Sequence, residues 1–538
     1  MTQLRFSLRL AFSSLPTAAA AASYRKRRPS LLTLSVLSLL AGAAGCGGVG
    51  GPEFPFKPEE ATIQNVRTAV KTGFLSCRNL AESYQLRHDS LDPTLHAVVT
   101  WNDRLMADAD RLDKIPTAQR GSFHCVPVVV KDNVDVAGLA TTAGALALAG
   151  SATQSHAEIV QRLLTAGAIV LGKTNMPDFA IDGINTKSSY GGQTQNPYNA
   201  SLTVYGSSGG TAAAITASLG IVGIGTDTYG SLVQPASATG VVAIRPTQGL
   251  VSAQGVLPLM TLQDTPGPMT RTVEDAAATL ELLVDKAQVG KGSQSYTSVL
   301  KDSGLTGLNL GFDPAVLQPL PAPLLTPSGE VSDLFYKALS DITQAGGKTK
   351  QVSALTTLFA SLQAATDASF SCMPVDFKQG LNGYLATRSD LTVKTLSDVI
   401  ATGKYLDSVK GFLTSAQSQK DTVQSSAACG TYLAAKAAAQ NAIVALMDKE
   451  GIDLLVYPAA NQPAFPIGTP PSGWFGFQML SSSTGLPSLS MPMGIAPKSA
   501  APVGLIFLAR PYQEAKLVQA AYAYQQKSRP RTPPPSQR

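Results

Sequence analysis

The sequence is poor in charged residues and in histidine. Only 14% of its 538 residues are Asp, Glu, Lys or Arg, 44% are hydrophobic, and four are histidines. This composition excludes a disordered or coiled-coil protein, and 47 glycines indicate many tight turns. It is typical of a compact enzyme with a large core.

The few histidines also exclude one familiar mechanism. Residues 206–210 spell G-x-S-x-G, the serine motif of α/β-hydrolases, whose acid and histidine follow the serine in the chain. Every histidine here precedes that motif: His88, His96, His124 and His156. A Ser-His-acid triad of the α/β-hydrolase type is therefore excluded.

Two other motif matches fail on physical grounds. Residues 167–174 spell G-x-x-x-x-G-K-T, but a P-loop needs a flexible turn, and residues 168–171 are an apolar run typical of a strand. Ser298 and Lys301 form S-x-x-K without the S-D-N element that should follow it in a β-lactamase. Neither nucleotide binding nor β-lactamase chemistry is expected.

The N-terminus resembles a bacterial export signal. The first 45 residues hold six basic residues and no acidic one, and the apolar run 31–44 is shorter than the ~20 residues of a spanning helix. It ends in Ala-Ala-Gly before Cys46, as in a lipoprotein cleavage site. We expect an exported, periplasmic or cell-envelope lipoprotein with Cys46 lipidated and residues 46–57 as a flexible tether. A plain linker remains the alternative, and Sec or Tat export stays open.

Removal of residues 1–45 would also change the charge. The formal net charge of +6 would lose six positive charges and fall to about zero. Nucleic acid is therefore not an expected partner. The membrane is expected as a partner only through the lipid.

Residues 58–526 are predicted to form one α/β domain. Apolar runs predict strands near 97–101, 126–130, 168–171, 221–225, 241–244, 452–457 and 503–508. Helical spacing lies between them, and Ser155 to Glu158 matches a capping box at the start of a helix. The alternation predicts a mixed, largely parallel sheet covered by helices on both faces. Residues 290–445 are expected to be a helical insertion or cap, and residues 527–538 a disordered, proline-rich tail.

Four cysteines besides Cys46 can form two disulfides in an exported protein. We favour the pairing with the shorter loops, Cys77 with Cys125 and Cys372 with Cys429. Four buried free thiols are the alternative.

A serine hydrolase without a usable histidine needs another base, and Lys131 is placed for that role. It follows the apolar run VPVVV, and burial lowers the pKa of a lysine by up to ~3 to 5 units. A surface lysine paired with Asp132 would be the alternative if the motif stood alone.

Two serine motifs follow Lys131. Ser207 lies in YGSSGG before an Ala-rich stretch, and Ser231 ends GTDTYGS. A sharp turn after a strand presents the second serine and aims successive backbone N–H groups at one point, as an oxyanion hole requires. Two structural Gly-Ser turns are the alternative.

These three motifs in this order resemble the amidase signature family of Ser-cisSer-Lys serine hydrolases. Further stretches resemble the family's landmarks, among them LGKTNMPDFA at 171–180 and DTPGPMTRTVEDA at 264–276. The resemblance implies that Lys131 is the base, Ser207 the bridging serine and Ser231 the nucleophile. It implies an oxyanion hole of backbone amides and two supporting residues, and no metal or cofactor. The amides are those of Thr228, Tyr229, Gly230 and Ser231, and the supports are Ser208 and Asp227.

The expected reaction is hydrolysis of a small-molecule or peptide amide. Tyr229 stands where many members have glycine, which bears on pocket shape. The LVQPAS segment after Ser231 favours a peptide-amidase-like substrate. One alternative is a catalytically inactive, lipid-anchored binding protein with the same fold. The other is a protein like the A component of an amidotransferase.

Overall fold

The computed structural model describes residues 56–150, 152–285, 295–317, 328–353, 355–469 and 479–537. The predicted export signal, Cys46 and nearly all of the predicted tether lie outside these residues. Within them, no helix is long and apolar enough to cross a membrane.

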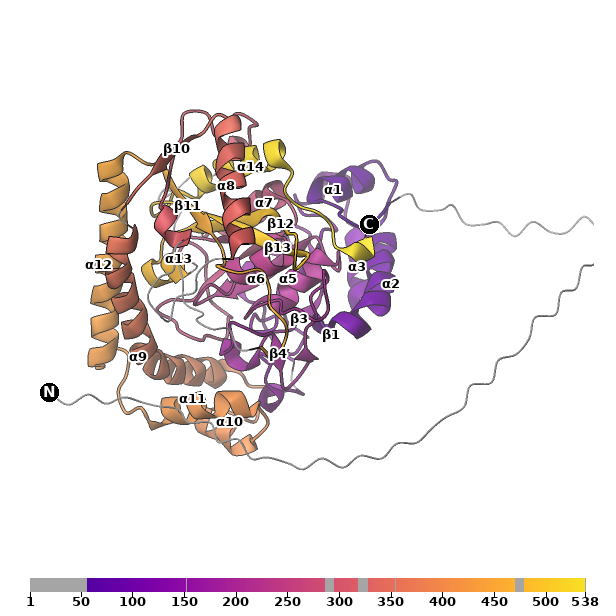
Figure 1. The fold of residues 1–538 in the computed structure, drawn as a ribbon. Coiled ribbons are helices and arrows are strands. Elements are labelled where there is room, and N and C mark those ends of the chain that lie inside the picture. The colour runs from indigo at the N-terminus through magenta and orange to yellow at the C-terminus, as the bar shows by residue number, and fades with distance from the viewer. Residues whose placement is uncertain are drawn as a thin grey trace, which may run out of the picture. The chain divides into compact units, whose positions relative to one another are not determined.

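One sheet of eleven strands runs through the domain (Figure 1), in the order β1-β3-β2-β6-β8-β7-β12-β13-β11-β9-β10. The strands are β1 (Val98–Trp101), β2 (Pro127–Lys131), β3 (Ile169–Thr174), β6 (Val222–Asp227), β7 (Val242–Arg245), β8 (Thr265–Thr270), β9 (Asn309–Phe312), β10 (Lys348–Gln351), β11 (Leu454–Pro458), β12 (Ser488–Ala496) and β13 (Ala501–Leu508). A separate small hairpin joins β4 (Lys187–Ser188) to β5 (Gly192–Gln193).

The sheet is mixed, as predicted. Strands β3, β2 and β6 are parallel, as are β11, β9 and β10 at the far end. The strands from β6 to β13 pair antiparallel through β8, β7 and β12. Each predicted apolar run overlaps a strand. Strands β8, β9, β10 and β12 coincide with none of the predicted apolar runs. The sequence of β8 does not look like a strand because it contains Pro266 and Pro268, and prolines are rare in central strands.

Helices cover the sheet. Helices α5 (Gly209–Thr216) and α6 (Val233–Thr239) pack on each other and on central strands. In a second group, α4 (Glu158–Thr165) and α14 (Glu514–Ser528) pack on α7 (Val273–Leu283), and α8 (Gly329–Gln344) packs on α14. Helix α3 (Leu105–Asp113) packs on β3 and on α2 (Cys77–Leu95). Helix α1 (Ile63–Lys71) is joined to α7, because its Ile63 N–H donates to the Asp275 carboxylate at 3.1 Å. The buried side chains between these layers form the main core.

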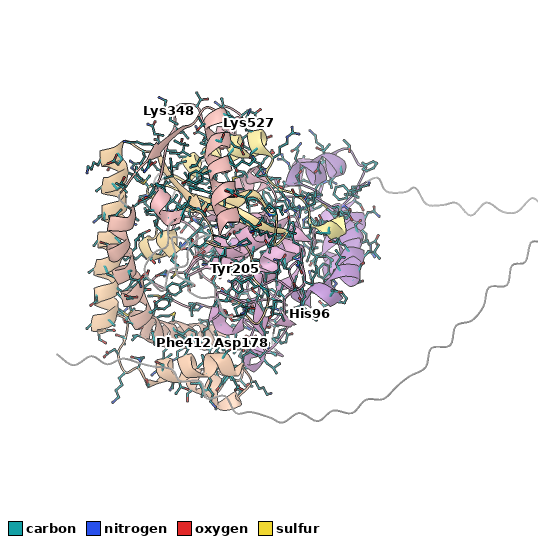
Figure 2. The ribbon with its side chains drawn as sticks, in the orientation of Figure 1. His96, Asp178, Tyr205, Lys348, Phe412 and Lys527 are labelled. Atoms are coloured by element: carbon teal, nitrogen blue, oxygen red, sulfur yellow. A yellow bond between two sulfur atoms is a disulfide. The ribbon has the colours of Figure 1, made fainter. Side chains whose placement is uncertain are left out.

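The segment predicted as a helical insertion also carries the edge strands β9 and β10. Its helices are α9 (Leu355–Thr387), α10 (Leu396–Thr402), α11 (Asp407–Ser418) and α12 (Ala427–Glu450), and a short α13 (Leu480–Thr484) follows later. Helices α9 and α12 lie side by side in Figure 1 and pack on each other. Below them α11 meets the segment around Asp178, whose carboxylate accepts the Leu406 N–H at 2.8 Å (Figure 2).

Two predictions were wrong. Helix α4 begins after Ala157 without a side-chain cap, because the backbone carbonyls of Asp135 and Gln254 accept its first N–H groups instead of Ser155. The C-terminal segment is not a disordered tail: the Arg531 guanidinium pairs with Glu60 at 2.6 Å and donates to the Gly240 carbonyl at 2.6 Å. These contacts fasten the chain end to the body of the domain.

Candidate active site

Lys131 ends β2, a strand whose five residues are all buried. Parallel neighbours flank the strand on both sides, β3 and β6. A lysine at the end of such a central strand has no path for its ammonium to reach solvent, and its exposed fraction is 0%. The site therefore forms where the carboxyl ends of adjacent parallel strands meet.

Hydroxyl groups surround the Lys131 amine. Its Nζ lies 2.8 Å from Ser207 Oγ, 2.9 Å from Ser208 Oγ and 2.9 Å from Thr226 Oγ1. The Thr226 carbonyl is 3.2 Å away. No carboxylate in the described part of the chain lies within ion-pair distance of this amine.

This environment changes the protonation of Lys131. Burial lowers its pKa to about 7, against the opposing effect of the more distant carboxylates of Asp227 and Asp264. In a large fraction of the protein molecules, Lys131 is therefore a neutral amine near pH 7. A neutral amine has a lone pair and can accept a proton.

The two serines beside Lys131 are not equivalent. Ser208 donates its hydroxyl proton to the Thr226 carbonyl at 3.0 Å, so it can only accept from the lysine. Ser207, which follows a cis peptide bond from Gly206, has no such acceptor among the described residues. Of these two serines, Ser207 is therefore the one that can exchange a proton with Lys131.

Small residues let these groups approach. Helix α5 begins at Gly209, directly after the serines, and a Cβ at Gly210 would lie 2.3 Å from the Asn175 carbonyl oxygen. Any larger residue there would push the start of α5, and with it both serines, away from Lys131. The Ser208 N–H also donates to the Ser231 carbonyl at 3.2 Å, which joins the two serine motifs.

The loop that carries Ser231 is held from within by Asp227. Its carboxylate accepts the Gly230 N–H at 2.9 Å and the Leu232 N–H at 2.8 Å. Buried Arg245 faces the same carboxylate, with Nε 3.3 Å from Oδ1. Gly230 has a φ of +94°, and a Cβ there would meet Gln234 at 2.8 Å, so the turn requires glycine.

One predicted oxyanion donor is not available in this arrangement. The Gly230 N–H already donates to Asp227, because the tight turn aims it inward at that carboxylate. The N–H groups of Thr228, Tyr229 and Ser231 meet no acceptor within the described residues. Three of the four predicted amides thus remain free to bind an anionic oxygen.

Comparison with known proteins shows the family to which the chain belongs. Residues 79–518 match the protein family described as Amidase. The native peptide amidase from Stenotrophomonas maltophilia is similar in structure, with a TM-score of 0.79 at 33% identity over 89% of this chain and 99% of that one. The chain belongs to the amidase family.

Two curated relatives are similar along nearly their whole length. The A component of the glutamyl-tRNA(Gln) amidotransferase from Exiguobacterium sibiricum is 30% identical over 490 residues, which cover 87% of this chain and 97% of that protein. A probable amidase from Arabidopsis thaliana is 29% identical over 503 residues, or 89% and 92% of the two chains. This amidase is thus an amide-hydrolysing enzyme with the amidase signature fold.

The amidase site also contains two residues that no sequence motif predicted, Thr226 and Asn133. Thr226 offers Lys131 both its hydroxyl and its carbonyl, and Asn133 donates to that hydroxyl at 3.2 Å. Thr226 lies at the carboxyl end of β6, next to β2. The rule that site residues gather at the ends of adjacent parallel strands could have found it.

Two disulfides are present in the amidase, Cys77 with Cys125 and Cys372 with Cys429, the pairing that the loop lengths favoured. Among the described residues, Cys77, His124 and Cys125 also form a cluster of metal-ligand types. Both sulfurs of that cluster are joined to each other.

Proposed function

We propose that this protein hydrolyses carboxylic amides through an acyl-enzyme on Ser231, with Ser207 and Lys131 as its proton relay. The observation that carries the proposal is the 2.8 Å contact between Lys131 Nζ and Ser207 Oγ, in a site where burial lowers the lysine pKa to about 7. A serine hydroxyl needs such a base to become a nucleophile.

The reaction proceeds in two halves. Neutral Lys131 takes the proton of Ser207, which takes that of Ser231, and Ser231 Oγ attacks the amide carbon. The C–N bond then breaks as the relay returns the proton to the leaving amine. Water attacks the acyl-enzyme by the same relay, and a carboxylic acid leaves.

Backbone amides stabilise the negative oxygen in both halves. The N–H groups of Thr228, Tyr229 and Ser231 are suited to this because none has an acceptor in the described chain. Loss of one oxyanion donor in other hydrolases costs roughly 10²- to 10³-fold in kcat.

The favoured substrate is a peptide with a C-terminal amide. The structural likeness to a peptide amidase supports this choice, together with the LVQPAS segment after Ser231. An amidotransferase A-like role is the second candidate, supported by the relative from Exiguobacterium sibiricum.

We further propose that the protein is exported and held in the bacterial cell envelope by lipid on Cys46. The basic leader and the small residues before Cys46 support this, and so do the two disulfides, since disulfides persist in oxidising compartments. Labelled fatty acid should enter the wild-type protein but not a Cys46→Ser variant. Equal labelling of both would contradict the anchor.

Ammonia release from a panel of amides tests the catalytic proposal. The panel contains amidated peptides, glutamine, and aryl and fatty amides, with wild type, Ser231→Ala and Lys131→Ala compared. Release should be lost in both variants while their circular dichroism spectra match wild type. Wild-type rates in Ser231→Ala would disprove the assignment. No release from any amide, with no fluorophosphonate labelling of Ser231, would favour the inactive binding protein.

A further inference from the structure

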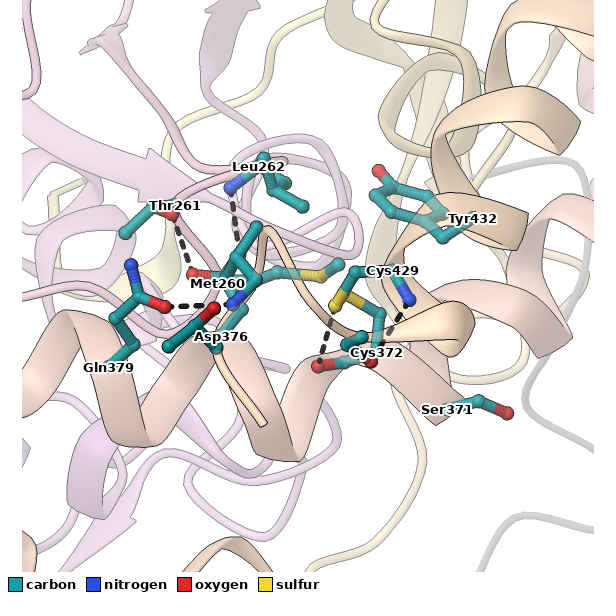
Figure 3. Close-up of a disulfide and its surroundings, with 12 residues drawn as sticks. Met260, Thr261, Leu262, Ser371, Cys372, Asp376, Gln379, Cys429 and Tyr432 are labelled. Atoms are coloured by element: carbon teal, nitrogen blue, oxygen red, sulfur yellow. Dashed lines mark hydrogen bonds between the residues drawn. A yellow bond between two sulfur atoms is a disulfide. The ribbon is translucent and has the colours of Figure 1, made fainter. Parts of the chain in front are cut away.

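Helices α9 and α12 contact the oxyanion loop, which is the loop of residues 228–231 that carries Ser231. The disulfide between Cys372 and Cys429 joins the two helices (Figure 3). Near it, the Phe370 ring of α9 stacks on Tyr229 at a centroid distance of 4.8 Å and an interplanar angle of 13°. The helices therefore contact the loop that ends in Ser231.

A chain of buried hydrogen bonds runs from α12 to the same loop. The Tyr432 hydroxyl donates to Gln263 Oε1 at 2.6 Å, and Gln263 Nε2 donates to the carbonyl of Thr228. Neither Tyr432 nor Gln263 is exposed to solvent. Burial raises the pKa of Tyr432 far above neutrality, so its hydroxyl stays a donor.

These contacts allow only one orientation of the Gln263 amide. The Thr228 carbonyl can only accept, so the NH₂ end must face it. The oxygen end then faces Tyr432, which supplies a proton. Rotation of the amide by 180° would place its oxygen against the Thr228 carbonyl oxygen, with no proton between them. The Thr228 carbonyl therefore fixes which end of Gln263 meets the loop, and the Tyr432 hydroxyl holds the other end in place.

The hydrogen bond to the Thr228 carbonyl also affects the Tyr229 N–H, which belongs to the same peptide unit. A peptide unit is planar, and in the trans form its C=O and N–H point in opposite directions. The peptide between Thr228 and Tyr229 is trans, so an anchored carbonyl sets the direction of the Tyr229 N–H. That N–H is one of the free oxyanion donors.

We propose that Gln263, held in place by Tyr432, is a positioning residue that aims the Tyr229 N–H at the reacting oxygen. This inference rests on the proposed function, since it assigns a task to a residue that supports the Ser231 site. Gln263 makes no hydrogen bond to Lys131 in the described chain and acts through the backbone of the Ser231 loop.

Helix α9 holds the two residues that precede Gln263 in the chain. Its Asp376 carboxylate accepts the Thr261 hydroxyl at 2.6 Å and the Leu262 N–H at 2.9 Å, directly before Gln263 in the chain (Figure 3). Cys429 lies one turn before Tyr432 on α12. The disulfide thus holds together the two helices that place Gln263 and its partner.

Steady-state kinetics of Gln263→Leu, Tyr432→Phe and the double variant test the proposal. Gln263→Leu should lower kcat roughly 10- to 100-fold, a share of the cost of losing an oxyanion donor, and leave KM within about twofold. Tyr432→Phe should lower kcat about 3- to 10-fold, as loss of one hydrogen bond does. Because Tyr432 acts only through Gln263, the double variant should match Gln263→Leu.

Two matched variants control for packing. Gln440→Leu removes a glutamine of α12 that donates to the Thr484 carbonyl at 2.9 Å. Tyr84→Phe removes a buried hydroxyl with no partner in the described chain. Both should keep wild-type kcat, and all variants should keep the acid limb of the pH profile, because Lys131 is untouched.

The outcomes separate this inference from the proposed function. Unchanged kcat in Gln263→Leu, or additive losses in the double variant, would overturn the positioning role while Ser231→Ala stays inactive. A fall in kcat matched by Gln440→Leu would overturn it as well. Retained activity in Ser231→Ala would instead overturn the proposed function itself.

Discussion

Two buried lysines end neighbouring strands, and their surroundings differ. Lys131 of β2 and Lys173 of β3 both have an exposed fraction of 0%. Lys173 Nζ lies 3.4 Å from the Asp132 carboxylate and 2.9 Å from the Ala140 carbonyl. Hydroxyls and one carbonyl surround Lys131 instead.

Burial lowers the pKa of both lysines, but what opposes it differs. Asp132 and Asp135 counteract the effect at Lys173, and the first of them is in contact. At Lys131 the opposing carboxylates are more distant, and its pKa falls to about 7. The two lysines therefore differ in their partners: the Lys173 amine has a carboxylate with which to form an ion pair, whereas the Lys131 amine has only hydroxyls and a carbonyl around it. The contact with Asp132 indicates a structural role for Lys173.

Substitution of Lys131 should have the largest effect on activity. Lys131→Met removes the base, and kcat should fall about 10⁴-fold or more, as when a member of a hydrolytic triad is lost. The free energy of unfolding should change less than in Lys173→Met, because the hydroxyl partners of Lys131 can pair with one another. Initial rates and urea unfolding measure both. A fall in kcat of less than tenfold would contradict the role of Lys131 as the base and its distinction from Lys173.

Substitution of Lys173 should affect stability instead. Lys173→Met leaves the Asp132 carboxylate buried and unpaired, and should lower the free energy of unfolding by ~3 to 5 kcal/mol. The double variant Lys173→Met with Asp132→Asn removes both charges and should recover most of that loss. Urea unfolding of the three proteins is the measurement. No recovery in the double variant would show that charge pairing is not the cause.

The pH dependence should follow Lys131. The neutral amine is the active form and exists above the pKa, so kcat/KM should rise with pH through about 7 and fall about tenfold per pH unit below it. Burial also brings the pKa values of Asp264 and Lys436 to about 7. Lys436→Met and Asp264→Asn should both keep the rising limb. Its disappearance in either variant would assign the limb to that residue.

Local sequence patterns predicted much of the site. The apolar run before Lys131 predicted a buried strand, and β2 is one. The glycines around Ser207 and Ser231 indicated tight turns, which the close approach at Gly210 and the positive φ of Gly230 require. These features depend on residues adjacent in the chain, so the sequence alone carries them.

Features that depend on distant partners could not be predicted in this way. The first N–H groups of α4 use carbonyls of Asp135 and Gln254 rather than Ser155. Arg531, near the C-terminus, forms an ion pair with Glu60, near the start of the described residues. No periodicity reports such contacts, because each partner looks like an ordinary surface residue in its own segment.

The sequence by itself determined which residues could do chemistry: a lysine after an apolar strand, two serines in glycine-rich turns, and no histidine after them. Tertiary structure decided their protonation and their partners. Burial without a carboxylate neighbour gives Lys131 a pKa of about 7, whereas contact with Asp132 marks Lys173 as structural. The physical reason is that a pKa depends on desolvation and nearby charge, and both arise only when distant strands and helices pack together.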